Sequence, residues 1–303
     1  MKLRSLLGLL GLILAAATRL PAAAAPATLE LRIVSYNILG GDGTGGTGTN
    51  AWAPRKELVA ELLRNQKADV IDLQKAARLS LDDLHQTLPG YGEAGVGRDD
   101  GKAGGEYAAI LYRQDRFEAE SSGTFWLSET PSTAGSVSWG ARQARVCTWV
   151  HLIDKATKAG FYVFNTHLDP TNVTVRDNSA ALILNRIKAR AQPDPFILTG
   201  DMNSPESSTT IRLYKGPQDL AAGAAASLDT PPLRDTFRVI HPDETGVSTR
   251  HQFTGSRNGE KVDYILVPPA FEVVSAEILR DQINGKYPSD HFPVAAALRL
   301  PLK

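Results

Sequence analysis

Short apolar runs along the chain alternate with segments whose apolar residues recur every three or four positions, so strands and helices are predicted in turn. One helix is predicted to open at Pro54, another to run from a Ser80 cap through Leu88, and a longer one to cover residues 173–190. Several predicted strands follow one another directly, which indicates a mixed rather than a purely parallel sheet arrangement. The predicted strands cover residues 31–39, 70–73, 107–112, 117–126, 146–153, 161–166, 196–199, 262–267, 271–279 and 294–298.

Segments rich in polar or small residues interrupt this pattern. Residues 40–50 form a Gly/Thr/Asp-rich stretch that is too polar to pack, so a loop is predicted there. Residues 124–145 are rich in Ser, Gly, Pro and Trp, and we expect a long loop that shapes specificity beside the site. The Ala-rich residues 220–227 are expected to form a surface insertion without a function of their own.

The N-terminal segment has the pattern of a secretory signal peptide. Lys2 and Arg4 precede an apolar run of about a dozen residues, and alanines at residues 22–25 provide small-residue cleavage spacing. The apolar run is shorter than the roughly 20 residues that span a bilayer, so no stable membrane span is expected. We therefore predict a signal peptide over residues 1–25, a single domain over residues 26–303, and a secreted or periplasmic protein.

Composition and charge narrow the classes of partner. The chain has 303 residues, 42% of them hydrophobic, which suits one large globular domain, and we expect a monomer. Removal of residues 1–25 leaves 30 Lys and Arg against 33 Asp and Glu, so the chain lacks the basic surplus that usually accompanies binding to long nucleic acid. Cys147 is the only cysteine, so no internal disulfide forms, and a buried, inert thiol is expected.

The candidate chemistry gathers where apolar strands end in polar residues. Taken singly, each such residue has an ordinary interpretation: Asn37 as a turn former, His167 as a core histidine, Asp201 as a helix cap and Asp290 as a loop acid. Asp263 differs, because it stands inside an apolar strand and needs a partner there. The segments are Ser35-Tyr36-Asn37, Asn165-Thr166-His167-Leu168-Asp169, Gly200-Asp201-Met202-Asn203, Val262-Asp263-Tyr264 and Ser289-Asp290-His291.

In this order, the five segments resemble the motif series of the endonuclease/exonuclease/phosphatase family, which includes deoxyribonuclease I, sphingomyelinases and inositol phosphatases. The resemblance covers about residues 31–298. It implies an α/β fold of the deoxyribonuclease I type, a four-layer α/β sandwich with two central mixed β-sheets flanked by helices. It also implies hydrolysis of phosphoester bonds, either phosphodiesters or phosphomonoesters, with the help of a divalent metal.

The resemblance assigns a divalent metal to Asn37, Asp290 and Asp201. Carboxylate and amide oxygens suit Mg²⁺ or Mn²⁺, and the chain has no Cys/His cluster that would suit zinc. A phosphate ester is anionic, so its hydrolysis needs a cation that screens charge and donors around the phosphate oxygens. The expected cofactor is therefore Mg²⁺ or Mn²⁺.

The resemblance also implies the catalytic roles. Asp201 and Asn203 would orient and deprotonate the attacking water, while His291, held by Asp263, would bind the scissile phosphate. His167 resembles a second active-site histidine of the deoxyribonuclease branch. Glu106 resembles the carboxylate partner of that histidine, and Arg145 resembles the arginine of that branch that contacts phosphate.

Lys75 departs from the family pattern. The segment from Asp69 to Lys75 resembles the family motif in which a strand ends in Gln-Glu and the glutamate is the principal metal ligand. A charged ammonium has no lone pair and repels a nearby cation, so Lys75 inverts the local charge. Asp72 is a poor replacement, because an odd separation along a strand puts it on the opposite face from Lys75.

Three functions remain open on these residues. The first is a metal-dependent phosphoesterase whose metal affinity is weakened by Lys75. The second is a catalytically degenerate family member that binds phosphorylated ligands, with the Lys75 ammonium as a built-in cation. The third is an interaction domain in which the polar cluster is a relic. The charge balance favours a small phosphorylated molecule, a phospholipid headgroup or a sugar phosphate over long nucleic acid, which is the alternative partner.

Overall fold

The structure is a computed structural model that describes residues 27–41, 46–216 and 232–302. The predicted signal peptide over residues 1–25 and the Ala-rich residues 220–227 lie outside the described residues, as do residues 42–45 of the predicted loop. In the described part of the chain, no helix is both long and apolar enough to cross a bilayer.

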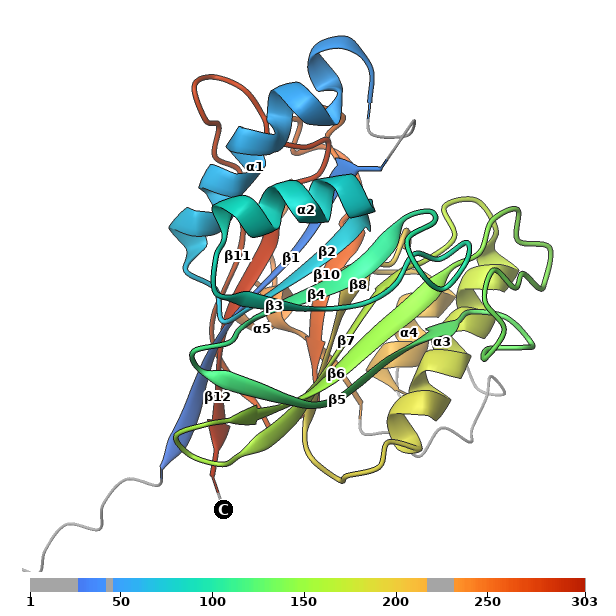
Figure 1. Ribbon diagram of the computed structural model, residues 1–303, viewed down its shortest axis with the longest axis vertical. Helices are drawn as coiled ribbons and strands as arrows, with labels where there is room; N and C mark the ends of the chain where they lie inside the picture. The colour runs from blue at the N-terminus through green and yellow to red at the C-terminus, as the bar shows by residue number, and fades with distance from the viewer. Residues whose placement is uncertain (1–26, 42–45, 217–231, 303) are drawn as a thin grey trace, which may run out of the picture.

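Two six-stranded sheets form the centre of the molecule (Figure 1). Each sheet contains one parallel pair, β1 with β2 and β7 with β8, and all its other pairs are antiparallel, which confirms the mixed arrangement. The first sheet has the order β11 (Glu272–Ile278), β12 (Val294–Pro301), β1 (Thr28–Gly40), β2 (Val70–Ala76), β4 (Tyr107–Arg113) and β3 (Tyr91–Ala94). The second has the order β5 (Phe117–Trp126), β6 (Val146–Asp154), β7 (Gly160–His167), β8 (Phe196–Asp201), β10 (Asp263–Val267) and β9 (Arg234–Asp235).

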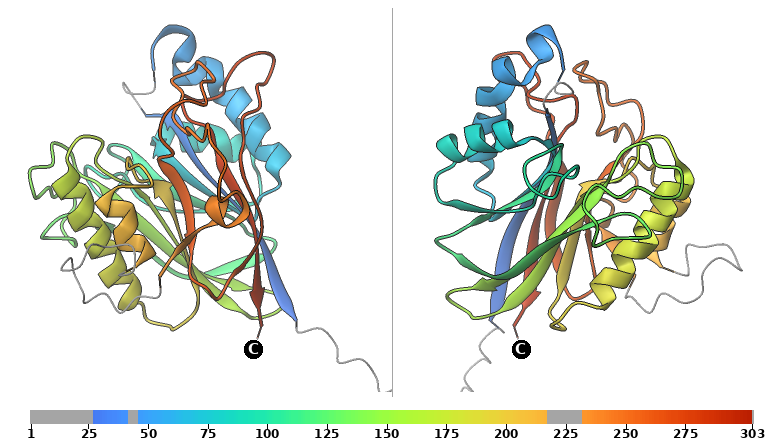
Figure 2. Two further views of the ribbon diagram at one scale, coloured as in Figure 1. Left: turned by 180° about the vertical axis from the view of Figure 1, so that it is seen from behind. Right: turned by 45° about the vertical axis from the view of Figure 1, so that its right-hand side comes forward.

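Helices cover the outer faces of the two sheets (Figures 1 and 2). Helices α1 (Trp52–Gln66) and α2 (Arg78–Thr87) pack on the first sheet, and α3 (Val173–Lys188) and α4 (Thr209–Lys215) pack on the second. The inner faces of the sheets share a third apolar core. This arrangement confirms the predicted four-layer sandwich. Two short elements, η1 (Gly48–Asn50) and α5 (Thr236–Ile240), complete the described helices.

The start of α2 corrects one prediction. The helix begins at Arg78, so Ser80 lies inside its first turn and is not the cap. The Ser80 hydroxyl accepts a hydrogen bond from the backbone N–H of Ala77, so the backbone donor just before the helix has a partner. The Ser80 side chain therefore stabilises the start of the helix from its third position, as the N3 residue of a capping box does.

A β-bulge at Lys75 shapes the end of β2. Gln74 pairs with Asn37 and Ala108, and Ala76 pairs with Gly40 and Tyr107, so Lys75 has no register partner in either ladder. It is an extra residue against β4, whereas β1 has two residues, Ile38 and Leu39, over the same interval. The φ of 51° at Lys75 lies in the left-handed region. Because a bulge changes the alternation of side chains, strand parity does not apply between Asp72 and Lys75, and their placement on opposite faces stays a prediction.

Asp72 lies before the bulge and belongs to the core between the sheets. Its Oδ2 accepts a hydrogen bond of 2.9 Å from the hydroxyl of Thr199 on β8. Burial raises the pKa of Asp72 well above its ordinary value, and the hydrogen bond from Thr199 lowers it in part. Asp72 therefore links the two sheets and does not take the place of the missing glutamate.

Candidate active site

Asp201 is the centre of the polar cluster. It ends β8, and its side chain is buried. Its Oδ2 accepts a hydrogen bond of 2.8 Å from Asn37 Nδ2 and lies 3.4 Å from Nε2 of His167 and 3.8 Å from Nε2 of His291. Three residues that the sequence placed at separate strand ends, Asn37, His167 and His291, thus converge on the carboxylate of Asp201, from both sheets of the sandwich.

The pairing of β8 with β10 places a second carboxylate beside the first. Asp263 and Asp201 are register partners, and Oδ2 of Asp263 lies 2.8 Å from Nδ1 of His291. Burial alone would lower the pKa of His291, but the carboxylates of Asp263 and Asp201 outweigh burial and raise it to about 9. His291 is therefore charged at neutral pH, and its Nε2–H faces Asp201.

The environment of Asp201 suits a base. Burial raises the pKa of this carboxyl group, and the nearby charge of Asp263 raises it further. His291 and the hydrogen bonds from Asn37 and the Asn203 backbone act in the opposite direction and lower it. A carboxylate with a raised pKa takes a proton from water more readily than an ordinary one.

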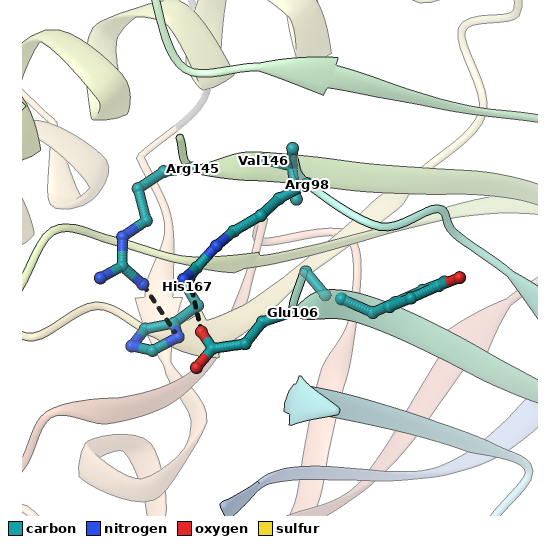
Figure 3. Close-up of a pocket in the computed structure, with 7 residues that line it drawn as sticks. Arg98, Glu106, Arg145, Val146 and His167 are labelled. Carbon is teal, nitrogen blue, oxygen red and sulfur yellow. Dashed lines mark hydrogen bonds and ion pairs between the residues drawn. The ribbon is translucent and has the colours of Figure 1, made fainter. Parts of the chain in front are cut away.

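His167 and Arg145 line a small pocket next to this cluster, together with Arg98 and Glu106 (Figure 3). Arg145 donates to Nδ1 of His167 over 3.2 Å, and a guanidinium can only donate, so Nδ1 accepts and the proton of the neutral ring is on Nε2, facing Asp201. Burial, and then the charges of Arg145 and Lys75, lower the pKa of His167 well below its ordinary value. His167 is therefore neutral at pH 7.

The carboxylate of Glu106 holds the guanidinium of Arg98, with Nη1 and Oε2 in direct contact (Figure 3). Nδ1 of His167 accepts a hydrogen bond from Arg145, and the role of Glu106 as the partner of His167 stays a prediction. Sequence reasoning missed Arg98, because this arginine lies in the loop before β4 and not at a strand end. Its only signal was the Gly-Arg-Asp-Asp-Gly turn around it.

The remaining predicted residues flank the cluster. Asn203 is half-buried with φ 45°, and its Nδ2 donates to the carbonyl of Leu168, so its amide plane is fixed beside Asp201. Asp290 is 9% exposed and accepts a 3.3 Å hydrogen bond from the Ser289 hydroxyl. The Ser289 hydroxyl is also 2.7 Å from the carbonyl of Asn37, which connects the Asp290 segment to β1.

Arg55 is a further residue that sequence reasoning missed. This buried side chain of α1 donates to the carbonyls of Ile38 and Leu39 at the end of β1 and to that of Pro288, two residues before Asp290. Arg55 therefore ties together the two segments that carry Asn37 and Asp290. Nothing in the helical pattern of α1 distinguishes it from a solvent-facing arginine.

The sequence pattern of the Endonuclease/Exonuclease/phosphatase family matches residues 34–291, so the chain belongs to that family. The chain is similar to the crystal structure of a family member from Bacteroides vulgatus, with 33% identity, a TM-score of 0.79, and coverage of 90% of this chain and 99% of the other. It is 31% identical to a mannosyl-6-phosphatase from Bacteroides thetaiotaomicron, with a TM-score of 0.74 and coverage of 88% and 99%. An uncharacterized protein of Acanthamoeba polyphaga mimivirus is 23% identical over 273 residues, which are 87% of this chain and 98% of that protein.

Members of this family generally hydrolyse phosphate esters and typically use a divalent metal, so the donor groups of this chain have to be compared with that requirement. Asp201, Asp263 and His291 bring three potential ligand atoms within 4.8 Å of one another. A protonated His291 has no lone pair for a metal, and a hydrogen bond occupies one of the two lone-pair positions on each oxygen of Asp201. These three residues are therefore held to one another by hydrogen bonds and ion pairs, and they fit a metal poorly.

The residues that the resemblance assigned to the metal fit it no better. Oδ1 of Asn37 accepts the backbone N–H of Leu39 over 3.2 Å, and the position of the expected glutamate holds the Lys75 ammonium. Asp290 alone adds a carboxylate, and a hard divalent cation normally takes several oxygen ligands. The described residues therefore do not fit a tightly held divalent cation.

Proposed function

We propose that this protein hydrolyses a phosphoester bond of a small phosphorylated molecule, and that a sugar phosphomonoester is its preferred class of substrate. The observation that carries the proposal is the convergence of a buried carboxylate, Asp201, with the charged ring of His291 and the arginine-lined pocket at His167. Support for a sugar phosphate comes from the 31% identity to the mannosyl-6-phosphatase.

Each group has a distinct task in the proposed reaction. The raised pKa of Asp201 suits it to accept a proton from the attacking water, and Asn203 lies beside it to orient that water. The charged Nε2–H of His291 donates to the phosphate, and Asp263 keeps the ring in place. Arg145 binds the equatorial phosphate oxygens, and neutral His167 adds a donor through Nε2.

We propose that any dependence on Mg²⁺ or Mn²⁺ is weakened in this chain. Asn37 and Asp290 are the residues that an ion at this site would contact, and Lys75 would oppose it. None of the tasks given to Asp201, His291 and Arg145 is routed through an ion.

A second candidate function follows from the same charge inversion. If the weakened site no longer supports turnover, the protein is a degenerate family member that binds phosphorylated ligands or serves as an interaction domain. Lys75 is the observation that favours this candidate, because it removes the principal metal ligand of the family. The described pocket of arginines would then serve binding alone.

We also propose that residues 1–25 direct export, so that a monomer of residues 26–303 acts outside the cytoplasm or in the periplasm. The basic, apolar and small-residue pattern of the N-terminal segment supports this. N-terminal sequencing of the protein recovered from the culture medium or the periplasm tests it, and a retained Met1 would contradict it.

Release of inorganic phosphate from the sugar phosphates, release of nitrophenol from the diester and cleavage of the DNA on a gel test the reaction. The purified protein is given mannose 6-phosphate, glucose 6-phosphate, bis-p-nitrophenyl phosphate and a DNA duplex, each with EDTA and with Mg²⁺. We expect turnover of the sugar phosphates, and a loss of about a hundredfold or more in Asp201→Asn. Glu30→Gln, near the end of β1 opposite to Asn37, is the matched control and should leave turnover unchanged. An absence of turnover on every substrate in both conditions would leave the binding candidate in its place.

A further inference from the structure

Lys75 lies between the two parts of the site. Strand β2 stands between β1, which carries Asn37, and β4, whose first residues Tyr107 and Ala108 line the arginine pocket. The bulge leaves Lys75 without a ladder partner on either side, at the end of β2 where both neighbouring strands deliver site residues. The bulge therefore takes the Lys75 side chain out of the regular alternation of side chains along β2.

The Lys75 ammonium is available for a ligand. The side chain is half-buried, and within residues 27–41, 46–216 and 232–302 it makes no hydrogen bond or ion pair with another residue. Lys261, by contrast, has a partner, because Oδ2 of the buried Asp235 lies 2.8 Å from its Nζ.

The surrounding charges complete an anion site. Arg98 and Arg145 bring two positive charges to the pocket, and Glu106 offsets one of them. The pocket and Lys75 together therefore hold a surplus of positive charge and hydrogen-bond donors. A phosphate group carries the complementary negative charge and several acceptor oxygens.

We propose that the Lys75 ammonium binds the phosphate group of the ligand directly and supplies the positive charge that a divalent cation supplies elsewhere in the family. Phosphate binding to this protein then needs no metal. The inference rests on the proposed function only in taking a phosphorylated ligand as the occupant of the site, and it requires no turnover.

Isothermal titration with inorganic phosphate in EDTA tests this inference. We expect the wild-type protein to bind phosphate in EDTA, and Lys75→Met to weaken binding about tenfold or more, because a charge-assisted contact is lost. Lys75→Arg keeps a cation and should bind within a few-fold of wild type. Lys75→Glu should lose binding in EDTA and regain part of it with Mg²⁺, because it restores the family ligand.

Lys67→Met is the matched control. Lys67 also has a left-handed backbone, with φ 48°, but it is exposed and precedes β2, at the end of that strand remote from the site. Its replacement should leave phosphate binding unchanged. Lys75→Gly is a second neutral variant that relieves the positive φ, so a folding defect in Lys75→Met would not obscure the result.

Two results would overturn the inference: phosphate binding by the wild type that requires Mg²⁺, or binding in EDTA that is equal in wild type, Lys75→Met and Lys75→Gly. Neither result depends on turnover. Phosphate binding in EDTA without hydrolysis of any substrate would keep this inference and reject the proposed enzyme. Hydrolysis that requires Mg²⁺, found together with either of the two results above, would keep the proposed enzyme and reject this inference.

Discussion

Oδ2 of Asp263 lies 2.8 Å from Nδ1 of His291, and both side chains are almost completely buried. The contact depends on the antiparallel pairing of β10 with β8, which sets Asp263 opposite Asp201. The ring of His291 therefore stands between two carboxylates, and their charges outweigh the effect of burial on its pKa. This relationship explains why an acid stands in an otherwise apolar strand.

Asp263→Asn should lower the pKa of His291. The pKa is about 9 while Asp263 is present, and without that charge only Asp201 and Asp290 oppose burial, so the pKa should fall. An NMR titration that follows the ring carbons of the histidines measures this shift. Glu277→Gln on the edge strand β11 is the control and should leave the titration of His291 as it is. An unchanged pKa in Asp263→Asn would refute the assigned cause.

The same pair predicts how stability depends on pH. The pKa of His291 is raised in the folded state, so the stabilisation that it provides is complete below the unfolded pKa of about 6.5 and is lost as pH rises through about 9. The free energy of unfolding should therefore fall across this window by roughly 3 kcal/mol more in wild type than in His291→Asn. Urea denaturation at pH 6, 7, 8 and 9.5 measures the difference. Parallel curves for the two proteins would contradict the prediction.

Arg145→Met should raise the pKa of His167. Burial is the largest cause of its low pKa, and the guanidinium of Arg145 is the next, so removal of that charge should move the pKa upward without restoring its ordinary value. The change also removes the donor to Nδ1, so the fixed Nε2–H tautomer of the ring should be lost. Nitrogen chemical shifts of the ring report both effects. Arg142→Met, at an exposed position three residues earlier, should show neither.

Arg98 and Glu106 should be strongly coupled in stability. Their side chains are 9% and 11% exposed, so Arg98→Met leaves a largely buried carboxylate without its contact to the guanidinium and should cost about 3 kcal/mol of unfolding free energy. Arg98→Met combined with Glu106→Gln should cost less than the sum of the single changes. Urea denaturation of the four proteins measures the coupling. The exposed pair of Arg299 and Glu30 should show less than 1 kcal/mol in the same cycle, and an equally small coupling at Arg98 would contradict the prediction.

The layers of the fold and the centre of the site could be predicted because their signals are local. Asn37, Asp201 and His167 each end an apolar strand, and strands that lie side by side deliver such residues to one place. The short edge strand β3 was missed, because a strand of four residues carries too little alternation to identify it. Strand β9 and helices α4 and α5 were missed for the same reason of length.

What could not be predicted depends on tertiary contacts or on backbone irregularity. The bulge at Lys75 comes from pairing with two neighbouring strands, which no periodicity within β2 reveals. Arg55 donates to backbone carbonyls of distant segments, and Arg98 pairs with Glu106, but neither arginine belongs to a strand-end motif. Their roles become visible only when the chain folds and brings these partners within reach.

A buried ion pair behind the site leads to a last prediction. Nζ of Lys261 lies 2.8 Å from Oδ2 of Asp235, both side chains are inaccessible to solvent, and the ammonium also lies over the ring of Tyr264. The Tyr264 hydroxyl contacts the carbonyl of Ser204, which follows Asn203, so this pair supports the turn beside Asp201. Burial lowers the pKa of Lys261, but the Asp235 carboxylate opposes this effect.

Lys261→Met should therefore destabilise the protein by about 3 to 5 kcal/mol, because it leaves the Asp235 carboxylate buried without its countercharge. A further change of Asp235 to Asn removes that charge and keeps an oxygen for the backbone N–H of Phe237, so the double variant should recover part of the loss. Thermal and urea unfolding measure these effects. Lys56→Met, which breaks a partly exposed pair with Asp83, should change stability by less than 1 kcal/mol. A Lys261 variant no less stable than this control would show that the pair does not hold the site in place.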